Sequence, residues 1–352
     1  MRKCEDFSSD YFGEMRLWAK ANSVPLKATF ELTPFCNFSC VMCYVRLNEA
    51  QAKKHGRLLS ADEWLEIARQ AKEEGTLHLT LTGGEPFLHP EFWKIYSELN
   101  RMGFLITLLS NGSLIDEAVM EKFEAFGMPY AVKLTVYGAS DETYRKTCGS
   151  NDGFSRMCKA IELLKNANVP LTLTSTVVRE NAHDLNEIYA FARSCGLPMQ
   201  HTVSVMKSFR NENSSIEESR FAFDEFSDEL SKDALEKSKF PPLDSPFAWC
   251  ASKNMSFWMT WNGNMQLCSF MNNPCVAYSG SFKDDWKKLL QKLDEIKTPE
   301  ECNKCEWSAF CQRCPGVLCA ESGSPECVSE SLCGMAERLT LLYRKSCKED
   351  AL

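Results

Sequence analysis

The spacing of apolar residues changes repeatedly between residues 27 and 205. Short runs rich in apolar and β-branched residues predict six strands, and segments with apolar residues three or four positions apart predict helices between them. Because strands and helices alternate, we expect a parallel sheet with right-handed crossovers. Six units are too few for a closed eight-stranded barrel, so the expected fold class is α/β, an open three-quarter (β/α)6 barrel. The expected strands are 28–32, 77–82, 105–109, 131–136, 171–178 and 201–205, and the expected helices are 61–74, 90–102, 116–126, 154–166 and 183–195.

The helix boundaries carry signals of their own. Ser60 followed by Glu63 predicts a capping box at the start of the first helix. Gly103, Gly127 and Gly196 stand where helices are expected to end. In a barrel of this kind, catalytic side chains are expected at the carboxyl ends of the strands.

The segments on either side of the barrel, 27–205, differ from it. Residues 1–26 form an N-terminal segment whose apolar side chains are expected to pack on the barrel. Residues 206–246 carry ten Asp/Glu against six Lys/Arg and predict a bridging helix or linker. Residues 247–352 predict a small cysteine-rich domain with a C-terminal helix and a hairpin over 258–267, whose two-residue turn is Asn262-Gly263. The apolar positions concerned are Tyr11, Phe12, Met15, Leu17 and Trp18 in the first segment, and Phe223, Phe226 and Leu230 in the second.

Composition excludes several classes of protein. The apolar fraction is 44% and the formal net charge is −8, so the chain lacks the excess of positive charge that is typical of nucleic-acid-binding proteins. No stretch approaches the roughly eighteen apolar residues of a membrane span, and the N-terminus lacks the apolar core of a secretion signal. We therefore expect a cytoplasmic protein that binds neither nucleic acid nor a membrane.

Cysteine is abundant and unevenly placed. Of eighteen cysteines, eleven lie from Cys250 to Cys347. A chain of this length can bury a core without disulfides, and in a reducing compartment such density favours metal binding. Cysteines outside such metal-binding groups are by default small buried or surface thiols. The cysteines expected to be ordinary thiols are Cys4, Cys148, Cys158, Cys195 and Cys347.

Three cysteines stand in one short loop after the first expected strand, as Cys36-x3-Cys40-x2-Cys43. Each thiolate can bind a different iron of a [4Fe-4S] cubane, which leaves the fourth iron open to the amine and carboxylate of a small molecule. A structural zinc site usually needs a fourth protein ligand. The loop therefore predicts an iron–sulfur cluster with one exchangeable position.

A second motif, Gly83-Gly84-Glu85-Pro86, follows the second expected strand. Its glycines allow the backbone to approach a ligand closely, and its carboxylate can hold a cationic amine. It is not a dinucleotide fingerprint, and the chain contains no Walker A sequence. The two motifs, in this order, resemble those of the radical S-adenosylmethionine (radical SAM) superfamily.

This resemblance implies a partial, TIM-like barrel in which SAM binds the open iron of the cluster. Reductive cleavage of SAM would give a 5′-deoxyadenosyl radical that abstracts hydrogen from a substrate. The catalytic and cluster-binding residues would be Cys36, Cys40 and Cys43. Met42 replaces the usual aromatic residue of the family, and Tyr137 stands where many relatives have aspartate. The implied cofactor-binding residues are Met42, Tyr44, Gly83, Gly84, Glu85, Pro86, Ser110, Asn111, Thr135 and Arg145.

The C-terminal cysteines resemble a SPASM domain, which carries two auxiliary [4Fe-4S] clusters in peptide-modifying members of the superfamily. The pattern assigns one cluster to Cys250, Cys268 and Cys314 and the other to Cys302, Cys305, Cys311 and Cys333.

Three assignments within this array have alternatives. The family usually has three residues between the last two central cysteines and this chain has two, so Cys319 is a substitute for Cys314. Cys275 could complete the first cluster, and Cys327 competes with Cys333. From spacing alone, the two Cys-x2-Cys pairs also fit a zinc knuckle.

The resemblance implies a peptide maturase of the oxidoreductase type. Its substrate would be a ribosomally synthesised peptide that receives a crosslink, thioether, epimerisation or oxidation, and a flavodoxin- or ferredoxin-like protein would donate electrons. Ser269 replaces an aspartate of the sulfatase-maturating branch, which argues against that branch. Because about 26 residues precede the first strand, we expect leader recognition by a separate protein or by none. The alternatives are a radical SAM enzyme for a small molecule or cofactor precursor, and an iron–sulfur redox or sensor protein.

Overall fold

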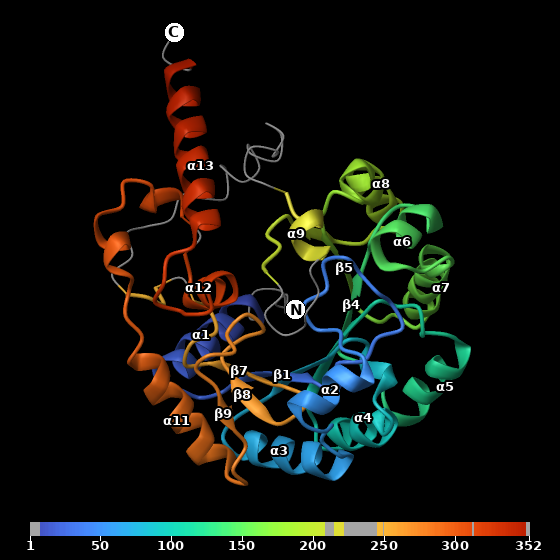
Figure 1. The fold of residues 1–352 in the computed structure, drawn as a ribbon. Helices are drawn as coiled ribbons and strands as arrows, with labels where there is room; N and C mark the ends of the chain where they lie inside the picture. The colour runs from blue at the N-terminus through green and yellow to red at the C-terminus, as the bar shows by residue number, and fades with distance from the viewer. Residues whose placement is uncertain (1–7, 208–214, 222–244, 249, 312, 350–352) are drawn as a thin grey trace, which may run out of the picture.

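The computed structural model describes residues 8–207, 215–221, 245–248, 250–311 and 313–349. Its nine-stranded sheet has the order β6-β5-β4-β3-β2-β1-β7-β8-β9. Strands β1 to β6 are parallel throughout, and helices surround the outside of the curved sheet (Figure 1). The strands are β1 Lys27–Glu31, β2 His78–Thr82, β3 Leu105–Ser110, β4 Ala131–Thr135, β5 Leu171–Thr176, β6 Met199–Thr202, β7 Ser256–Met259, β8 Asn264–Gln266 and β9 Val276–Ala277.

The expected partial barrel is confirmed, because six parallel strands alternate with helices and the sheet does not close. Two short helices that the sequence pattern did not predict, α2 and α6, lie among the expected ones. The helices are α1 Ser8–Ala21, α2 Glu49–His55, α3 Ala61–Glu73, α4 Phe92–Arg101, α5 Glu117–Phe126, α6 Asp141–Cys148, α7 Gly153–Asn166, α8 Leu185–Cys195, α9 Ser215–Ser219, α11 Phe282–Asp294, α12 Pro315–Ser322 and α13 Glu330–Glu349.

The local signals at the helix ends are confirmed. Ser60 and Glu63 form the capping box of α3. Gly127 and Gly196 follow the last residues of α5 and α8, with positive φ angles that glycine adopts without a Cβ clash.

The two faces of the barrel strands differ in polarity. Side chains directed to the helices, such as Phe30, Leu81 and Leu108, are fully buried with Trp64 and Phe123 from the helices in one apolar cluster. The Phe30 and Trp64 rings lie 4.8 Å apart. Burial of this helix-facing layer fixes the register of the strands, because a shift by one residue would expose it.

The C-terminal hairpin differs from the sequence expectation in two ways. Strand β7 pairs in parallel with β1, so the hairpin extends the barrel sheet. The turn has three residues and not two: the Thr260 amide donates to the Asn264 carbonyl at 2.9 Å, and Gly263 donates to Thr260 at 2.9 Å. Gly263 has a φ of +83°, which is typical of a three-residue loop that ends in a left-handed residue.

Other expectations for the flanking segments were only partly correct. Phe12, Leu17 and Trp18 of α1 are exposed, whereas Met15 packs against the small cluster that contains Ala19. Among the apolar side chains that the structure describes, α1 packs on the rest of the protein through Met15 and Ala19, and the side chain of Tyr11 lies outside the described ones. Strand β6 also begins and ends earlier than expected. Phe223, Phe226 and Leu230 lie outside the described residues. None of the helices in the described part of the chain is both long and apolar enough to cross a membrane.

Candidate active site at the carboxyl ends of the strands

The three-cysteine loop leaves the carboxyl end of β1 and is anchored on both sides. The Ser39 and Val41 amides donate to the Cys148 and Thr147 carbonyls at the end of α6, each at 2.9 Å. Phe38 is buried and packs edge-on against the Tyr137 ring, 6.0 Å away. These contacts hold the loop over the barrel although it has no regular secondary structure.

The sulfur atoms of this loop lie in surroundings suited to bound thiolates. Backbone amides of Phe38 and Arg46 donate to the Cys36 and Cys43 sulfurs, at 3.4 and 3.2 Å. Burial and the nearby Cys40 thiol raise the pKa of Cys43 to about 11. Burial, followed by the Glu85 charge, also raises the pKa of Cys36. A positive centre is needed to hold these groups as thiolates, and iron supplies it.

The three cysteines therefore fit a cubane with one open iron. In the described segments of the chain, no three Cys, His, Asp or Glu side chains are grouped so as to hold a single metal ion. In a cubane each sulfur binds a separate iron, so the three sulfurs need not meet at one point.

The Gly83-Gly84 pair brings the second motif directly against the cysteine loop. The Gly84 and Glu85 amides donate to the Thr33 and Phe35 carbonyls at 2.7 and 2.8 Å. A Cβ atom on Gly84 would lie 2.6 Å from the Phe35 carbonyl carbon, and one on Gly83 would lie 3.1 Å from the Thr33 nitrogen. Only glycine allows the two loops to pair this closely.

Glu85 is fully buried and joins the ends of β2 and β3. Its carboxylate accepts hydrogen bonds from the Ser110 hydroxyl at 2.9 and 3.1 Å and from the Asn111 amide at 3.0 Å. Burial raises its pKa to about 7. Asn111 in turn donates to Asn37 in the cysteine loop at 3.0 Å, and Asn37 donates to Ser113 at 2.8 Å. No sequence motif pointed to Asn37 or Ser113, which carry this link between the strand ends and the loop.

A cavity of about 320 Å³ lies at the carboxyl ends of the strands, between these two loops. Of the residues that the sequence singled out, Cys36, Glu85 and Pro86 do not line it, and Arg145 is exposed on α6. The singled-out residues that line it are Cys40, Met42, Cys43, Tyr44, Gly83, Gly84, Ser110, Asn111, Thr135 and Tyr137.

The rest of the cavity wall was not predicted. Thr82, Thr174, Thr176 and Thr202 line it from strands β2, β5 and β6, and Phe270 lines it from the C-terminal region. The Phe270 ring lies 5.5 Å from that of Tyr44. Threonines at alternate positions of β5 were visible in the sequence, but only the direction of the strand identifies which of them face the cavity.

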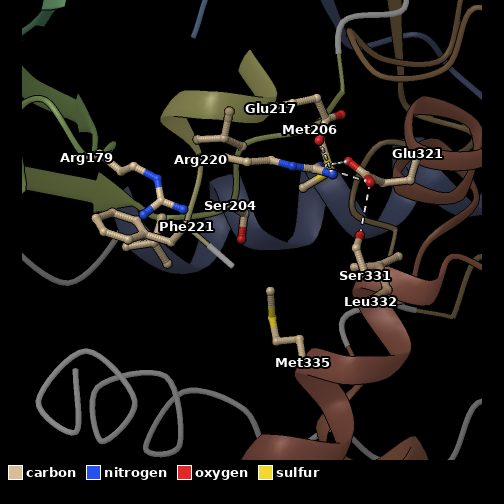
Figure 2. Close-up of a pocket in the computed structure, with 12 residues that line it drawn as sticks. Arg179, Ser204, Met206, Glu217, Arg220, Phe221, Glu321, Ser331, Leu332 and Met335 are labelled. Atoms are coloured by element: carbon tan, nitrogen blue, oxygen red, sulfur yellow. Dashed lines mark hydrogen bonds and ion pairs between the residues drawn. The ribbon is translucent and has the colours of Figure 1, made fainter. Parts of the chain in front are cut away.

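A second cavity of about 260 Å³ adjoins the first, and Ser204, Val205 and Met206 line both. Figure 2 shows Arg220 directed toward the Glu321 carboxylate, with Ser331 on its other side. Arg220 and Ser331 donate to Glu321 at 2.9 and 3.0 Å. This mostly buried ion pair connects the exit of β6 and α9 to the C-terminal helices, and it forms one wall of the second cavity.

The C-terminal cysteines separate into two sets. Burial raises the pKa of Cys268 to about 12, and the neighbouring Cys314 and Cys250 thiols act in the same direction. A Cβ atom on Gly316 would lie 3.1 Å from the Cys268 sulfur and 3.8 Å from the Cys314 sulfur, so glycine keeps the space beside them open. Burial, followed by Cys302 and Cys333, raises the pKa of Cys311 to about 11.

The neighbours of the cysteines whose assignment was open also differ. Burial, followed by Cys302 and Cys305, raises the pKa of Cys333, whereas Cys327 is exposed. The Cys319 thiol instead donates to Asn272 at 3.2 Å, and the Cys275 thiol raises its pKa after burial. Cys314 and Cys333 thus lie with the proposed ligand sets, and Cys319 lies with Cys275.

We expect single alanine variants to separate ligands from neighbouring thiols. Cys314→Ala and Cys333→Ala should each lower the iron content of the anaerobically reconstituted protein by up to about four irons per chain. Cys319→Ala and Cys327→Ala are the matched controls and should keep the wild-type iron content. Iron and sulfide per chain are the measurements. If only Cys319→Ala and Cys327→Ala lost iron, these two cysteines would be the cluster ligands in place of Cys314 and Cys333.

Comparison with known proteins agrees with this geometry. Residues 30–192 match the model of the Radical SAM superfamily. This part of the chain is a radical SAM domain. It contains both the three-cysteine loop and the Gly-Gly-Glu-Pro motif, and its borders enclose most of the segment from β1 to α8.

Two curated relatives each match about half of the chain. The chain is 28% identical over 174 residues to PqqA peptide cyclase of Gluconobacter oxydans. The aligned residues make up 49% of this chain and 48% of the relative. It is 27% identical over 192 residues to AdoMet-dependent heme synthase of Methanosarcina barkeri, covering 54% of each. The chain thus spans about half the length of these curated relatives.

A solved structure is similar over nearly the whole chain. Streptococcus suis SuiB bound to the precursor peptide SuiA has a TM-score of 0.65 at 15% identity, covering 92% of this chain and 80% of SuiB. At this level of identity the likeness concerns the fold, and it extends beyond the radical SAM domain into the cysteine-rich region.

Proposed function

We propose that this protein is a radical SAM enzyme that modifies a ribosomally synthesised peptide. The observation that carries the proposal is the backbone pairing of the two motif loops, Gly84 to Thr33 and Glu85 to Phe35, at the mouth of a cavity of about 320 Å³. This pairing holds the three-cysteine loop beside a pocket of the size that a small cofactor requires, which supports the assignment of its thiols as cluster ligands.

Cys36, Cys40 and Cys43 would hold a [4Fe-4S] cluster, with SAM at its open iron. When bound, this pair supplies one-electron cleavage of the sulfonium to methionine and a 5′-deoxyadenosyl radical, which abstracts hydrogen from the substrate. A flavodoxin- or ferredoxin-like donor would provide the electron.

The chain's own residues would bind and orient SAM and exclude water. Gly83 and Gly84 expose backbone groups to the cavity, and Met42 and Tyr44 offer apolar surface for the adenine. Ser110, Asn111 and Thr135 add hydrogen-bonding groups at the strand ends. Glu85 holds Ser110 and the Asn111 backbone in place, so it would act by positioning them, and Pro86 would fix the start of the turn that follows.

The C-terminal cysteine sets would hold two auxiliary [4Fe-4S] clusters. Cys250, Cys268 and Cys314 fit the first, because Gly316 leaves open space beside two of these sulfurs. Cys302, Cys305, Cys311 and Cys333 fit the second, because their thiols raise the pKa values of Cys311 and Cys333. Such clusters would carry electrons between the surface and the substrate.

A peptide is the favoured substrate for two reasons. The PqqA peptide cyclase is a relative over about half of the chain, and the fold is similar to that of SuiB over nearly the whole chain. The second cavity, which shares Ser204, Val205 and Met206 with the first, is where we expect a substrate side chain to enter. A small-molecule substrate is the second candidate, and the AdoMet-dependent heme synthase favours it.

The deciding experiment is anaerobic. The reconstituted, dithionite-reduced protein is expected to convert SAM to 5′-deoxyadenosine and methionine, measured by chromatography and mass spectrometry. An iron–sulfur sensor or redox protein would give neither product. Addition of candidate peptides encoded near the gene, compared with porphyrin precursors, separates the two substrate classes by which one changes mass.

A further inference from the structure

The half of the barrel interior farthest from the cysteine loop is polar. Lys27, His78 and Lys133 line a cavity of about 340 Å³ there. Closed barrels of this type fill the interior with branched apolar side chains. Here the inward positions of the strands carry three basic groups and the hydroxyls of Thr29, Thr80, Thr107 and Ser256, and Ser252 adds a hydroxyl from the segment before β7.

This cavity is distinct from the candidate active site, but Cys268, a proposed ligand of the first auxiliary cluster, lines part of its wall. Lys27, His78 and Ser256 are the first residues of β1, β2 and β7, so the cavity lies at the amino ends of the strands. Trp258 lines both cavities and donates a hydrogen bond to Glu31 at 2.9 Å. Trp258 therefore belongs to the walls of both cavities.

The basic groups act on one another. Burial, followed by Arg16 and Lys133, lowers the pKa of Lys27, and burial followed by Lys27 lowers the pKa of His78. Among the described residues, no Asp or Glu lines this cavity. Like charges in a partly dehydrated space are costly, and an anion among them would relieve both their repulsion and their lost hydration.

We propose that this cavity binds a small dianionic ligand, a phosphate ester or a dicarboxylate, between Lys27, His78 and Lys133. The hydroxyls provide neutral donors for further oxygens, and the volume exceeds that of phosphate alone, so an organic group can accompany the anion. Lys133 is exposed, which gives the ligand a route from solvent. The proposal does not depend on the reaction proposed above, but it requires that a cluster held by Cys268 leave the space between the three basic groups open.

Calorimetric titration of the reconstituted protein at low ionic strength tests this site, with inorganic phosphate, AMP and succinate as separate probes. We expect Lys27→Gln and Lys133→Gln each to weaken binding by about tenfold or more, because each removes one charge contact. Lys288→Gln is the matched control, since Lys288 is exposed on α11 and does not line the cavity. We also expect phosphate to raise the pKa of His78, followed by NMR and assigned with His78→Asn.

The outcomes separate clearly. Binding of phosphate and AMP in preference to succinate identifies a phosphate site, and the reverse identifies a carboxylate site. If no probe binds at about 10 mM, the basic groups only balance the charge of the cluster proposed at Cys268, and the ligand site is refuted. Equal binding by wild type, Lys27→Gln and Lys133→Gln also overturns it. Because Lys133 is exposed, Lys133→Gln is expected to fold, so a loss of binding in this variant reports on the ligand site and not on unfolding.

Discussion

The Cys36/Cys40/Cys43→Ala variant is expected to form no 5′-deoxyadenosine and to hold about four fewer irons per chain than the wild type. Three [4Fe-4S] clusters correspond to about twelve irons, and this variant should retain about eight. Only one cluster should be lost, because the three sulfurs lie in a single loop, which backbone hydrogen bonds to Thr147 and Cys148 hold in place. The auxiliary sets are built from other parts of the chain.

The measurements are iron and sulfide after anaerobic reconstitution, together with product formation from SAM. Cys158→Ala/Cys195→Ala is the matched control, because these two thiols lie beside each other and outside all three proposed sites. It should keep full iron content and activity. A triple variant that retained about twelve irons would place the clusters elsewhere, and one that still cleaved SAM would refute the proposed function.

The second large effect is expected for Gly84→Val. A Cβ atom at this position would lie 2.6 Å from the Phe35 carbonyl carbon and 2.9 Å from the Pro34 oxygen. Backbone atoms cannot move aside as a side chain can, so the two motif loops would have to separate. Overpacking of this kind costs about 1–3 kcal/mol, and we expect the affinity for SAM to fall by roughly tenfold or more.

Equilibrium dialysis with labelled SAM measures this loss, and thermal unfolding reports the stability of each variant. The matched control is Gly13→Ala, since no atom lies within 4 Å of the Cβ it would add and the residue lies in α1. It should leave SAM binding unchanged and stabilise the helix by about 0.5–1 kcal/mol. Wild-type affinity in Gly84→Val would mean that the Gly-Gly loop does not shape the cofactor cavity.

Features of the site that depend on residues close together in the sequence could be predicted, and features that depend on distant residues could not. The cysteine spacing and the Gly-Gly pair are local patterns, so the primary sequence sufficed to locate both motifs and most strand positions. The alternation of strands and helices also predicted the open barrel, because crossover handedness and burial leave few arrangements. The register of Phe30 and Leu81 against the helices follows from the same apolar pattern.

Contacts between distant segments were decided only by the tertiary fold. Glu85 faces Ser110 and the Asn111 backbone and does not line the cavity, because its side chain is buried at the junction of β2 and β3. Strand β7 extends the barrel sheet beside β1, which no local pattern indicated. The grouping of Cys314 with Cys268, and of Cys319 with Asn272, depends on how the C-terminal loops pack.

The polar barrel interior illustrates the same division. Lysine, threonine and histidine at alternate positions of β1 and β2 are plain in the sequence, but they resemble an ordinary solvent-facing side of a strand. Only the curvature of the sheet around them brings Lys27, His78 and Lys133 into one cavity. Loop chemistry and the barrel were predictable from the order of residues, because both rest on short-range spacing and apolar periodicity. Which side chains share a cavity was not, because long-range packing sets those distances.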